Sequence, residues 1–179
     1  MRLLLITFTL LIAGCSVEET NQPMPTTPQT QITTMKLTSP AFEEGASIPA
    51  RFTCQRDDIS PELRISDVPD NAKSLVLVMD DPDAPMGTWD HWLLFNIDSS
   101  TELIVENSEP TASKGVNSWG RTGYGGPCPP SGTHRYFFKL YALDSGLDLA
   151  DGASKQDLLN AMEDHILEEA TLMGTYQKQ

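Results

Sequence analysis

The chain contains a set of side chains that could form a small binding site: Asp81, His91, His134 and Tyr136. An imidazole N–H and a phenol O–H donate the hydrogen bonds that an oxyanion needs. A carboxylate can take an ammonium group, or it can orient a histidine so that the other ring nitrogen faces a ligand. We expect these side chains to converge around one small concave site that binds phosphate-like anions.

The predicted strands explain why these residues should meet. Asp81 follows a short, continuous apolar run, which favours a strand covered on both faces. His91 begins the next clear strand, and His134 precedes an alternating one. The predicted strands are Ser74–Met79, His91–Ile97 and Arg135–Leu143. Polar groups at strand ends have few structural reasons to cluster, so this placement favours a site.

A long segment rich in glycine and proline, 115–132, precedes the last of these strands. Irregular segments of this length in a compact domain are usually functional or disordered. Good strands flank this one and its prolines limit its freedom, so we expect an ordered wall of the site over Gly125–Pro130. Glycine lets the backbone approach a ligand, and successive N–H groups can form an anion-binding nest.

Several neighbouring residues have structural interpretations. Asp83 is favoured as a turn residue that caps backbone groups in a proline-rich corner. We expect Trp89 and Trp92 to pack rather than to contact a ligand. We expect Arg121 and Arg135 to pair with some of the chain's many acids.

An enzyme is the main alternative class. Two histidines and a carboxylate could activate a metal-bound water. The tight ligand spacing HExxH is absent from the sequence, as is the nucleophile motif GxSxG. We therefore expect a binding domain, not an enzyme, with no catalytic residue, no metal and no cofactor.

The charge balance restricts the partners. The chain has 12 Lys and Arg residues against 25 Asp and Glu residues, a net charge of −13. Nucleic-acid binding depends mainly on Lys and Arg, so we expect no nucleic-acid partner. An anion must bind against the mean field of the protein, which favours a small, local pocket.

The N-terminus predicts export. Arg2 precedes the apolar run Leu3–Ala13, which is too short to span a bilayer but fits the core of a secretory signal. The run ends in small residues before Cys15, which resembles the lipobox of bacterial lipoproteins. The alternative is an ordinary cleaved signal with a cysteine there by chance.

We expect residues 1–14 to be a lipoprotein signal peptide and Cys15 to be lipidated. Residues 15–34, rich in Thr, Gln and Pro, are expected to form a disordered tether. Residues 35–179 are expected to form one domain of ordinary size. The expected location is the cell envelope, with a lipid anchor in the outer membrane and the domain facing the periplasm, rather than the inner membrane.

The remaining pattern predicts a mainly β domain. One helix is predicted from Ser154, with Asp157 as its capping-box partner, to Gly174. Many strands and one late helix indicate a sandwich of antiparallel sheets with a peripheral C-terminal helix. Cys54 and Cys128 are either a disulfide or two separate buried thiols.

The motifs together resemble a known family, the phosphatidylethanolamine-binding proteins, also called Raf-kinase-inhibitor-like proteins. The order is DPDAP at 81–85, the His–aromatic pair at 91–92, and a Gly/Pro loop that ends in HRY at 134–136. The segments Phe52–Leu63 and Gly125–Asp144 are similar to the bacterial branch, and the likeness covers about Leu37–Tyr176.

The resemblance implies two packed antiparallel sheets with a shallow pocket at one end for a phosphate, a related oxyanion or a carboxylate-bearing small molecule. The expected ligand is a small anion or a phospholipid headgroup. It places Cys54 and Cys128 near that end, so that a bridge between them is expected to be feasible. Relatives regulate kinases or inhibit proteases, so the alternative function is a protein-interaction module with a vestigial or modulatory pocket. The implied ligand-binding residues are Asp81, His91, Gly126, Pro127, His134 and Tyr136.

Overall fold

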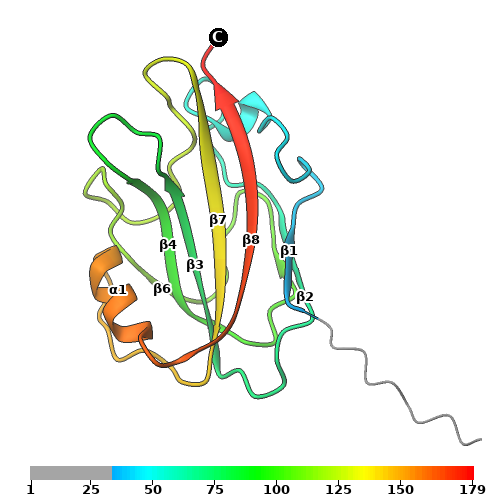
Figure 1. Cartoon of the computed structure of the whole chain (residues 1–179), viewed down its shortest axis with the longest axis vertical. Helices are drawn as coiled ribbons and strands as arrows, with labels where there is room; N and C mark the ends of the chain where they lie inside the picture. Colours follow the sequence, from blue (N-terminus) through cyan, green and yellow to red (C-terminus); the bar gives the residue numbers. More distant parts are fainter. Residues whose placement is uncertain (1–33) are drawn as a thin grey trace, which may run out of the picture. The chain divides into compact units, whose positions relative to one another are not determined.

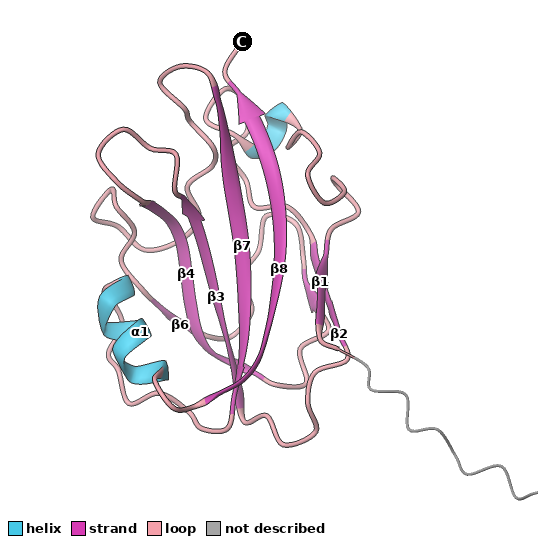
Figure 2. Cartoon of the chain, in the orientation of Figure 1, coloured by secondary structure: helices cyan, strands magenta, loops and turns pink. Residues whose placement is uncertain are grey.

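The computed structural model describes residues 34–179 (Figures 1 and 2). The signal peptide, the lipidation of Cys15 and the tether up to residue 33 lie outside the described residues, so they stay predictions. Among residues 34–179, no helix has both the length and the apolar character that crossing a membrane requires.

The described part is mainly β, as predicted. Its strands are β1 (Lys36–Thr38), β2 (Leu63–Ser66), β3 (Ser74–Asp81), β4 (Trp89–Asp98), β5 (Leu103–Ile104), β6 (Ser113–Lys114), β7 (Thr133–Leu143) and β8 (Ile166–Gln177). One short 3-10 helix, η1 (Ala50–Phe52), and one α-helix, α1 (Lys155–Met162), complete the described elements.

The strands form two antiparallel sheets, ordered β1-β2-β5 and β6-β4-β3-β7-β8. Every residue of β3 is buried because both faces of the larger sheet are covered. Leu75 and Leu77 pack with the smaller sheet, whereas Val76 and Val78 pack under α1. Figure 1 shows these two covering layers on opposite sides of the larger sheet. The predicted sandwich with a peripheral helix is confirmed.

The end of the predicted helix is wrong. The capping box is present, since the Ser154 side chain accepts from the backbone N–H of Asp157, but α1 ends at Met162 instead of Gly174. Asp164 then adopts a left-handed backbone with φ 66°, which breaks the helical path. The remainder of the predicted helix belongs to β8.

Tertiary pairing explains this difference. Strand β8 pairs with β7 along almost its whole length, and its buried residues alternate with a period of two: Ala170, Leu172, Gly174 and Tyr176. Gly174 is not a helix cap, because it lies within β8 opposite Tyr136. A Cβ there would lie 2.5 Å from Cγ1 of Ile48, so close packing requires the glycine. The apolar spacing in 166–173 satisfied a helical pattern as well, and only the partner strand decided between the two.

The pairing register of the larger sheet places the ends of three strands, β3, β4 and β7, close together. Strand β3 ends at Asp81, which lies opposite Trp89 at the start of β4. On the other side of β3, Asp80 lies opposite Phe137, three residues after His134 near the start of β7. Antiparallel pairing therefore puts the end of β3 and the beginnings of β4 and β7 at one end of the sheet.

Candidate functional site

A cavity of about 240 Å³ lies at this end of the larger sheet. Its lining is Asp81, Ala84, Pro85, Trp89, His91, Trp119, Cys128, Pro130 and His134. Ligand pockets for drug-sized molecules usually measure 300–1,000 Å³, so this one suits a smaller ligand. The structure thus brings the carboxylate and both histidines of the sequence prediction to one site.

Asp81 orients His134. Oδ2 of Asp81 lies 2.7 Å from Nδ1 of His134, and both side chains are buried. The other carboxylate oxygen, Oδ1, accepts the backbone N–H of Asp83 at 2.8 Å. Both oxygens of Asp81 are therefore engaged, and the Nε2 atom of His134 is the ring nitrogen left for a ligand.

His91 is fixed in the same way by a different partner. Its Nδ1 lies 2.6 Å from the carbonyl oxygen of Gly125, to which an N–H there donates. Burial lowers the pKa of His91 below its usual 6.5, although the Gly125 carbonyl and nearby acids oppose this effect. The ring also makes edge-to-face contacts with Trp119 and Tyr136, with centroids 5.0 and 5.2 Å away.

Tyr136 lies beside the pocket without lining it. The side chain is fully buried, and its hydroxyl has no hydrogen-bond partner within the described part of the chain. Burial and the nearby charge of Asp81 raise the pKa of the phenol well above its usual value. Tyr136 therefore supports the His91 ring as a neutral residue, and its predicted direct contact with a ligand is not visible in the lining.

Gly126 and Pro127 do not line the pocket, contrary to the prediction. The Gly126 N–H donates to Oδ1 of Asp58 at 2.7 Å, and the Pro127 carbonyl accepts from the backbone N–H of Cys54 at 3.2 Å. A Cβ at Gly126 would lie 2.4 Å from the Phe52 carbonyl oxygen. The glycine permits close packing of two loops, and its N–H is not available to a ligand. Within the predicted wall Gly125–Pro130, Cys128 and Pro130 are the residues that line the cavity.

Sequence reasoning missed the aromatic part of the pocket. Trp89 and Trp119 both line the cavity, and their rings meet edge to face with centroids 5.4 Å apart. The expectation that Trp89 only packs therefore differs from the structure. Its position two residues before His91 is the signal for a shared face of β4. By contrast, Trp92 is fully buried and donates to Glu109 at 2.7 Å, as the packing interpretation requires. No periodic pattern marks Trp119, which lies in an irregular loop.

Asp83 and Arg135 form an ion pair near the pocket. The guanidinium and backbone N–H groups of Arg135 donate to both carboxylate oxygens of Asp83 over 2.7–2.9 Å. These bonds lower the pKa of Asp83 to about 2. Arg121 instead lies over the Trp119 ring, 5.6 Å from its centroid, and donates to the Tyr124 carbonyl. Arg135 therefore pairs with an acid as expected, whereas Arg121 forms no ion pair with an acid of residues 34–179.

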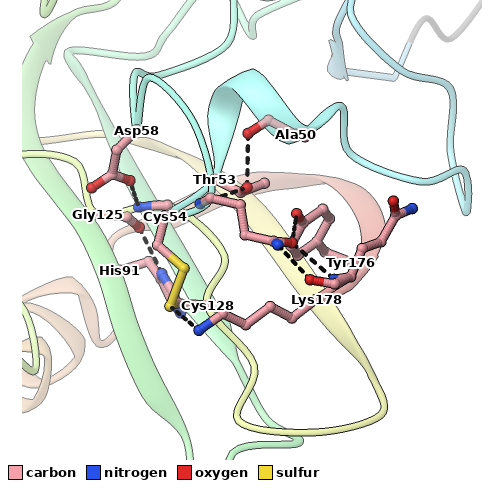
Figure 3. Close-up of a disulfide and its surroundings, with 12 residues drawn as sticks. Ala50, Thr53, Cys54, Asp58, His91, Gly125, Cys128, Tyr176 and Lys178 are labelled. Atoms are coloured by element: carbon pink, nitrogen blue, oxygen red, sulfur yellow. Dashed lines mark hydrogen bonds between the residues drawn. A yellow bond between two sulfur atoms is a disulfide. The ribbon is translucent and has the colours of Figure 1, made fainter.

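A disulfide joins Cys54 to Cys128, whose Cα atoms are 5.5 Å apart (Figure 3). It fastens the pocket wall to the segment that follows η1. In the same view, the His91 ring is held by Gly125 and the Lys178 side chain reaches the Cys128 sulfur. Within residues 34–179, no group of three His, Cys, Asp or Glu side chains is arranged to hold a metal ion.

Comparisons with known proteins agree with this architecture. The chain is 51% identical over 151 residues to a UPF0098 protein of Methanothermobacter thermautotrophicus, covering 80% of this chain and 99% of the relative. A UPF0098 protein of Chlamydia pneumoniae is 46% identical over 149 residues, covering 80% and 99%.

Solved structures show the same fold. A putative phosphatidylethanolamine-binding protein homologue from Chlamydia trachomatis superposes with a TM-score of 0.80 at 46% identity, covering 82% of this chain and 99% of the other. YbcL of E. coli, described as a new member of the mammalian family, gives 0.77 at 27% identity, covering 82% and 100%. The family model described as phosphatidylethanolamine-binding protein matches residues 38–177. The chain therefore belongs to the phosphatidylethanolamine-binding protein family.

Proposed function

We propose that the domain binds a phosphate-like anion or a phosphorylated headgroup in the cavity at the end of the larger sheet, without covalent catalysis. The observation that carries this proposal is the pair of anchored histidines. Nδ1 of His134 is engaged by Asp81 and Nδ1 of His91 by Gly125, so both rings keep Nε2 for a ligand. Membership of the family is consistent with small-ligand binding or a regulatory role.

The lining makes ligand binding depend on protonation. It contains no Lys or Arg, and the chain carries a net charge of −13. With Nδ1–H donated to protein groups, a neutral histidine presents Nε2 as an acceptor, and a protonated one presents it as a donor. A phosphate monoester that keeps one proton offers both an O–H and acceptor oxygens, so it suits one histidine of each kind.

Affinity should therefore rise as the pH falls. The lowered pKa of His91 means that this ring gains its proton only below about pH 6.5. Protonation of His91 turns its Nε2 from an acceptor into a donor and adds a positive charge to the pocket. Calorimetric titration with phosphate and with phosphoethanolamine between pH 8 and pH 5.5 measures this; constant affinity across the range would contradict the proposal.

Variants of the two histidines test the site directly. Loss of a hydrogen bond to a charged group costs about 1.5–3 kcal/mol, so His91→Ala and His134→Ala should each weaken phosphate binding about ten- to a hundredfold. His165→Ala is the matched control, because His165 pairs with Asp144, and neither residue lines the pocket. Equal affinities in all these proteins would refute the site. Binding of phosphoethanolamine but not phosphate would assign the site to headgroups.

A protein partner is the second candidate function. One specific observation favours it: Met86 is 95% exposed in the β3–β4 loop, next to the pocket residues Ala84 and Pro85. An apolar side chain beside a pocket suits contact with another protein. Met86→Glu should then remove a partner from a pull-down while phosphate binding stays unchanged. An identical set of captured proteins from wild type and variant would exclude this role for Met86.

A further inference from the structure

The loop between Tyr124 and the start of β7 is held in two different ways. Hydrogen bonds hold its first part: Tyr124 donates its hydroxyl to Phe52, Gly126 donates its N–H to Asp58, and Pro127 accepts from Cys54. The second part, 128–132, is fastened by the disulfide to Cys54. Because Cys128 and Pro130 line the cavity, a covalent bond fixes this side of the pocket wall.

The disulfide is open to solvent. Cys54 and Cys128 are both exposed, in contrast to the buried residues Thr53 and Pro127 next to them. Exposed disulfides are accessible to attacking thiolates, and they are more often labile or regulatory than buried ones. A thiolate in solution can therefore reach this disulfide, whereas it could not reach one buried in the core.

The two sulfurs of the disulfide differ in their electrostatic surroundings. Nζ of Lys178 lies 4.0 Å from the Cys128 Sγ (Figure 3). Within residues 34–179, no hydrogen bond from a cationic side chain reaches the Cys54 sulfur. In thiol–disulfide exchange, negative charge builds up on the attacking and leaving sulfurs and least on the central one, and a stabilised thiolate leaves faster. An ammonium beside Cys128 therefore favours Cys128 as the leaving sulfur.

We propose that Cys54 is a site of thiol–disulfide exchange with low-molecular-weight thiols, that Cys128 is the leaving sulfur, and that the exchange loosens the 128–132 wall of the pocket. The thiolate of the incoming thiol attacks Sγ of Cys54. The S–S bond breaks, and its electron pair leaves on Sγ of Cys128, beside Lys178. A mixed disulfide remains on Cys54.

A second thiolate completes the reduction. It attacks the small-molecule sulfur of the mixed disulfide, which releases Cys54 as a thiolate and forms the disulfide of the two small thiols. Two thiols are oxidised and one protein disulfide is reduced, so the electrons balance. The site of attack depends only on the disulfide and Lys178, so this inference does not rest on the proposed anion binding.

The test maps the mixed disulfide in the full chain. Oxidised protein is mixed with reduced glutathione, quenched with N-ethylmaleimide and digested for mass spectrometry, which also separates the Cys15 peptide. We expect at least about three molecules with glutathione on Cys54 for each one with glutathione on Cys128. Lys178→Gln should bring this ratio close to one, and Lys178→Arg should restore it. Lys73→Gln, a loss of charge at the opposite end of β3, should leave the ratio unchanged.

Two results of this mapping would overturn the proposed chemistry. One is glutathione placed equally on both cysteines, or mainly on Cys128, in the wild type. The other is a disulfide that does not exchange while an exposed model peptide disulfide does.

The loosened wall has its own readout, limited proteolysis of the oxidised and the glutathione-modified protein with a protease of broad specificity. Cleavage within 128–132 should become faster in the modified protein, and cleavage within 124–127, where hydrogen bonds remain, should stay unchanged. Equal cleavage of 128–132 in both forms would refute the link between exchange and the pocket wall.

Discussion

The two histidines of the pocket are held by different kinds of structure. His134 is fixed by Asp81, a charged partner on the neighbouring strand of the same sheet. His91 is fixed by the neutral carbonyl of Gly125, on a loop that is itself fastened by hydrogen bonds and a disulfide. Both rings therefore have an anchored Nδ1 and an Nε2 left for a ligand. At His134 this depends on one hydrogen bond to a carboxylate, and at His91 it depends on the placement of the loop that carries Gly125.

The orientation of His134 depends on neighbouring strands, whereas the orientation of His91 depends on segments that are distant in the sequence. The His134 side needs only adjacent strands and one carboxylate. The His91 side needs the segment after η1, the 124–132 loop and the end of β8 to be correctly placed. Changes far from the pocket should therefore affect the two sides unequally.

The largest effect should come from removing the disulfide with the double variant Cys54→Ser, Cys128→Ser. The bridge closes a sequence separation of 74 residues, and the chain-entropy model predicts a loss of about 4 kcal/mol of unfolding free energy. Urea unfolding measures this loss. Because hydrogen bonds still hold the 124–127 segment that carries Gly125, and β3 still presents Asp81, the imidazole resonances of both histidines should remain those of the wild type. A shift at either histidine would show that its anchor depends on the bridge.

Removing the carboxylate on the other side should cost slightly less. Asp81→Ala removes the hydrogen-bond partner of His134 and the acceptor for the Asp83 N–H, and the loss of these two bonds to a charged group costs about 3 kcal/mol. The matched variant is Asp83→Ala in the same DPDAP motif, whose partner Arg135 is largely exposed. Its loss should be about 1 kcal/mol or less. Equal destabilisation by the two variants would contradict the orienting role of Asp81.

Gly126→Ala tests the loop packing behind His91. The new Cβ would lie 2.4 Å from the Phe52 carbonyl oxygen and 2.5 Å from Oδ1 of Asp58, so both segments must move. Overpacking of this kind costs about 1–3 kcal/mol. At Gly146 the nearest atom to such a Cβ is 3.7 Å away, so Gly146→Ala should change unfolding free energy by less than about 1 kcal/mol. Similar losses for both glycines would refute the packing argument.

The smallest effect is a pH dependence that belongs to His91. Its folded-state pKa is lowered below 6.5 by burial, so the unfolded chain binds more protons between these two values. The contribution of His91 to stability is therefore complete above about pH 6.5 and is lost as the pH falls toward the folded-state pKa. Unfolding of wild type and His91→Gln at several pH values should show a shallower decline in the variant. Parallel curves would exclude His91 as the source.

Local sequence patterns were sufficient for much of the fold. The buried run before Asp81 predicted a strand covered on both faces, and β3 is fully buried. Ser154 and Asp157 predicted the start of α1, because a capping box involves residues only three apart. The clustering of Asp81, His91 and His134 also followed from strand ends, since antiparallel neighbours return to the same edge of a sheet.

The remaining features depend on contacts between residues far apart in the sequence. The 166–177 segment is a strand because β7 offers a partner, although its apolar spacing also fits a helix. The N–H of Gly126 donates to Asp58, which lies 68 residues away in the sequence. The loop sequence alone therefore could not show that this N–H is not available to a ligand. Trp119 lines the pocket from an irregular loop, whose sequence has no helical or strand periodicity from which its position could be predicted.

The sequence by itself determined which side chains reach one end of the larger sheet, because strand periodicity and local capping act over a few residues. Only the tertiary structure decided which of their donors remain available to a ligand. A hydrogen-bonding group is free or engaged according to its nearest neighbour in space, and at His91, His134 and Gly126 that neighbour lies 34, 53 and 68 residues away along the chain.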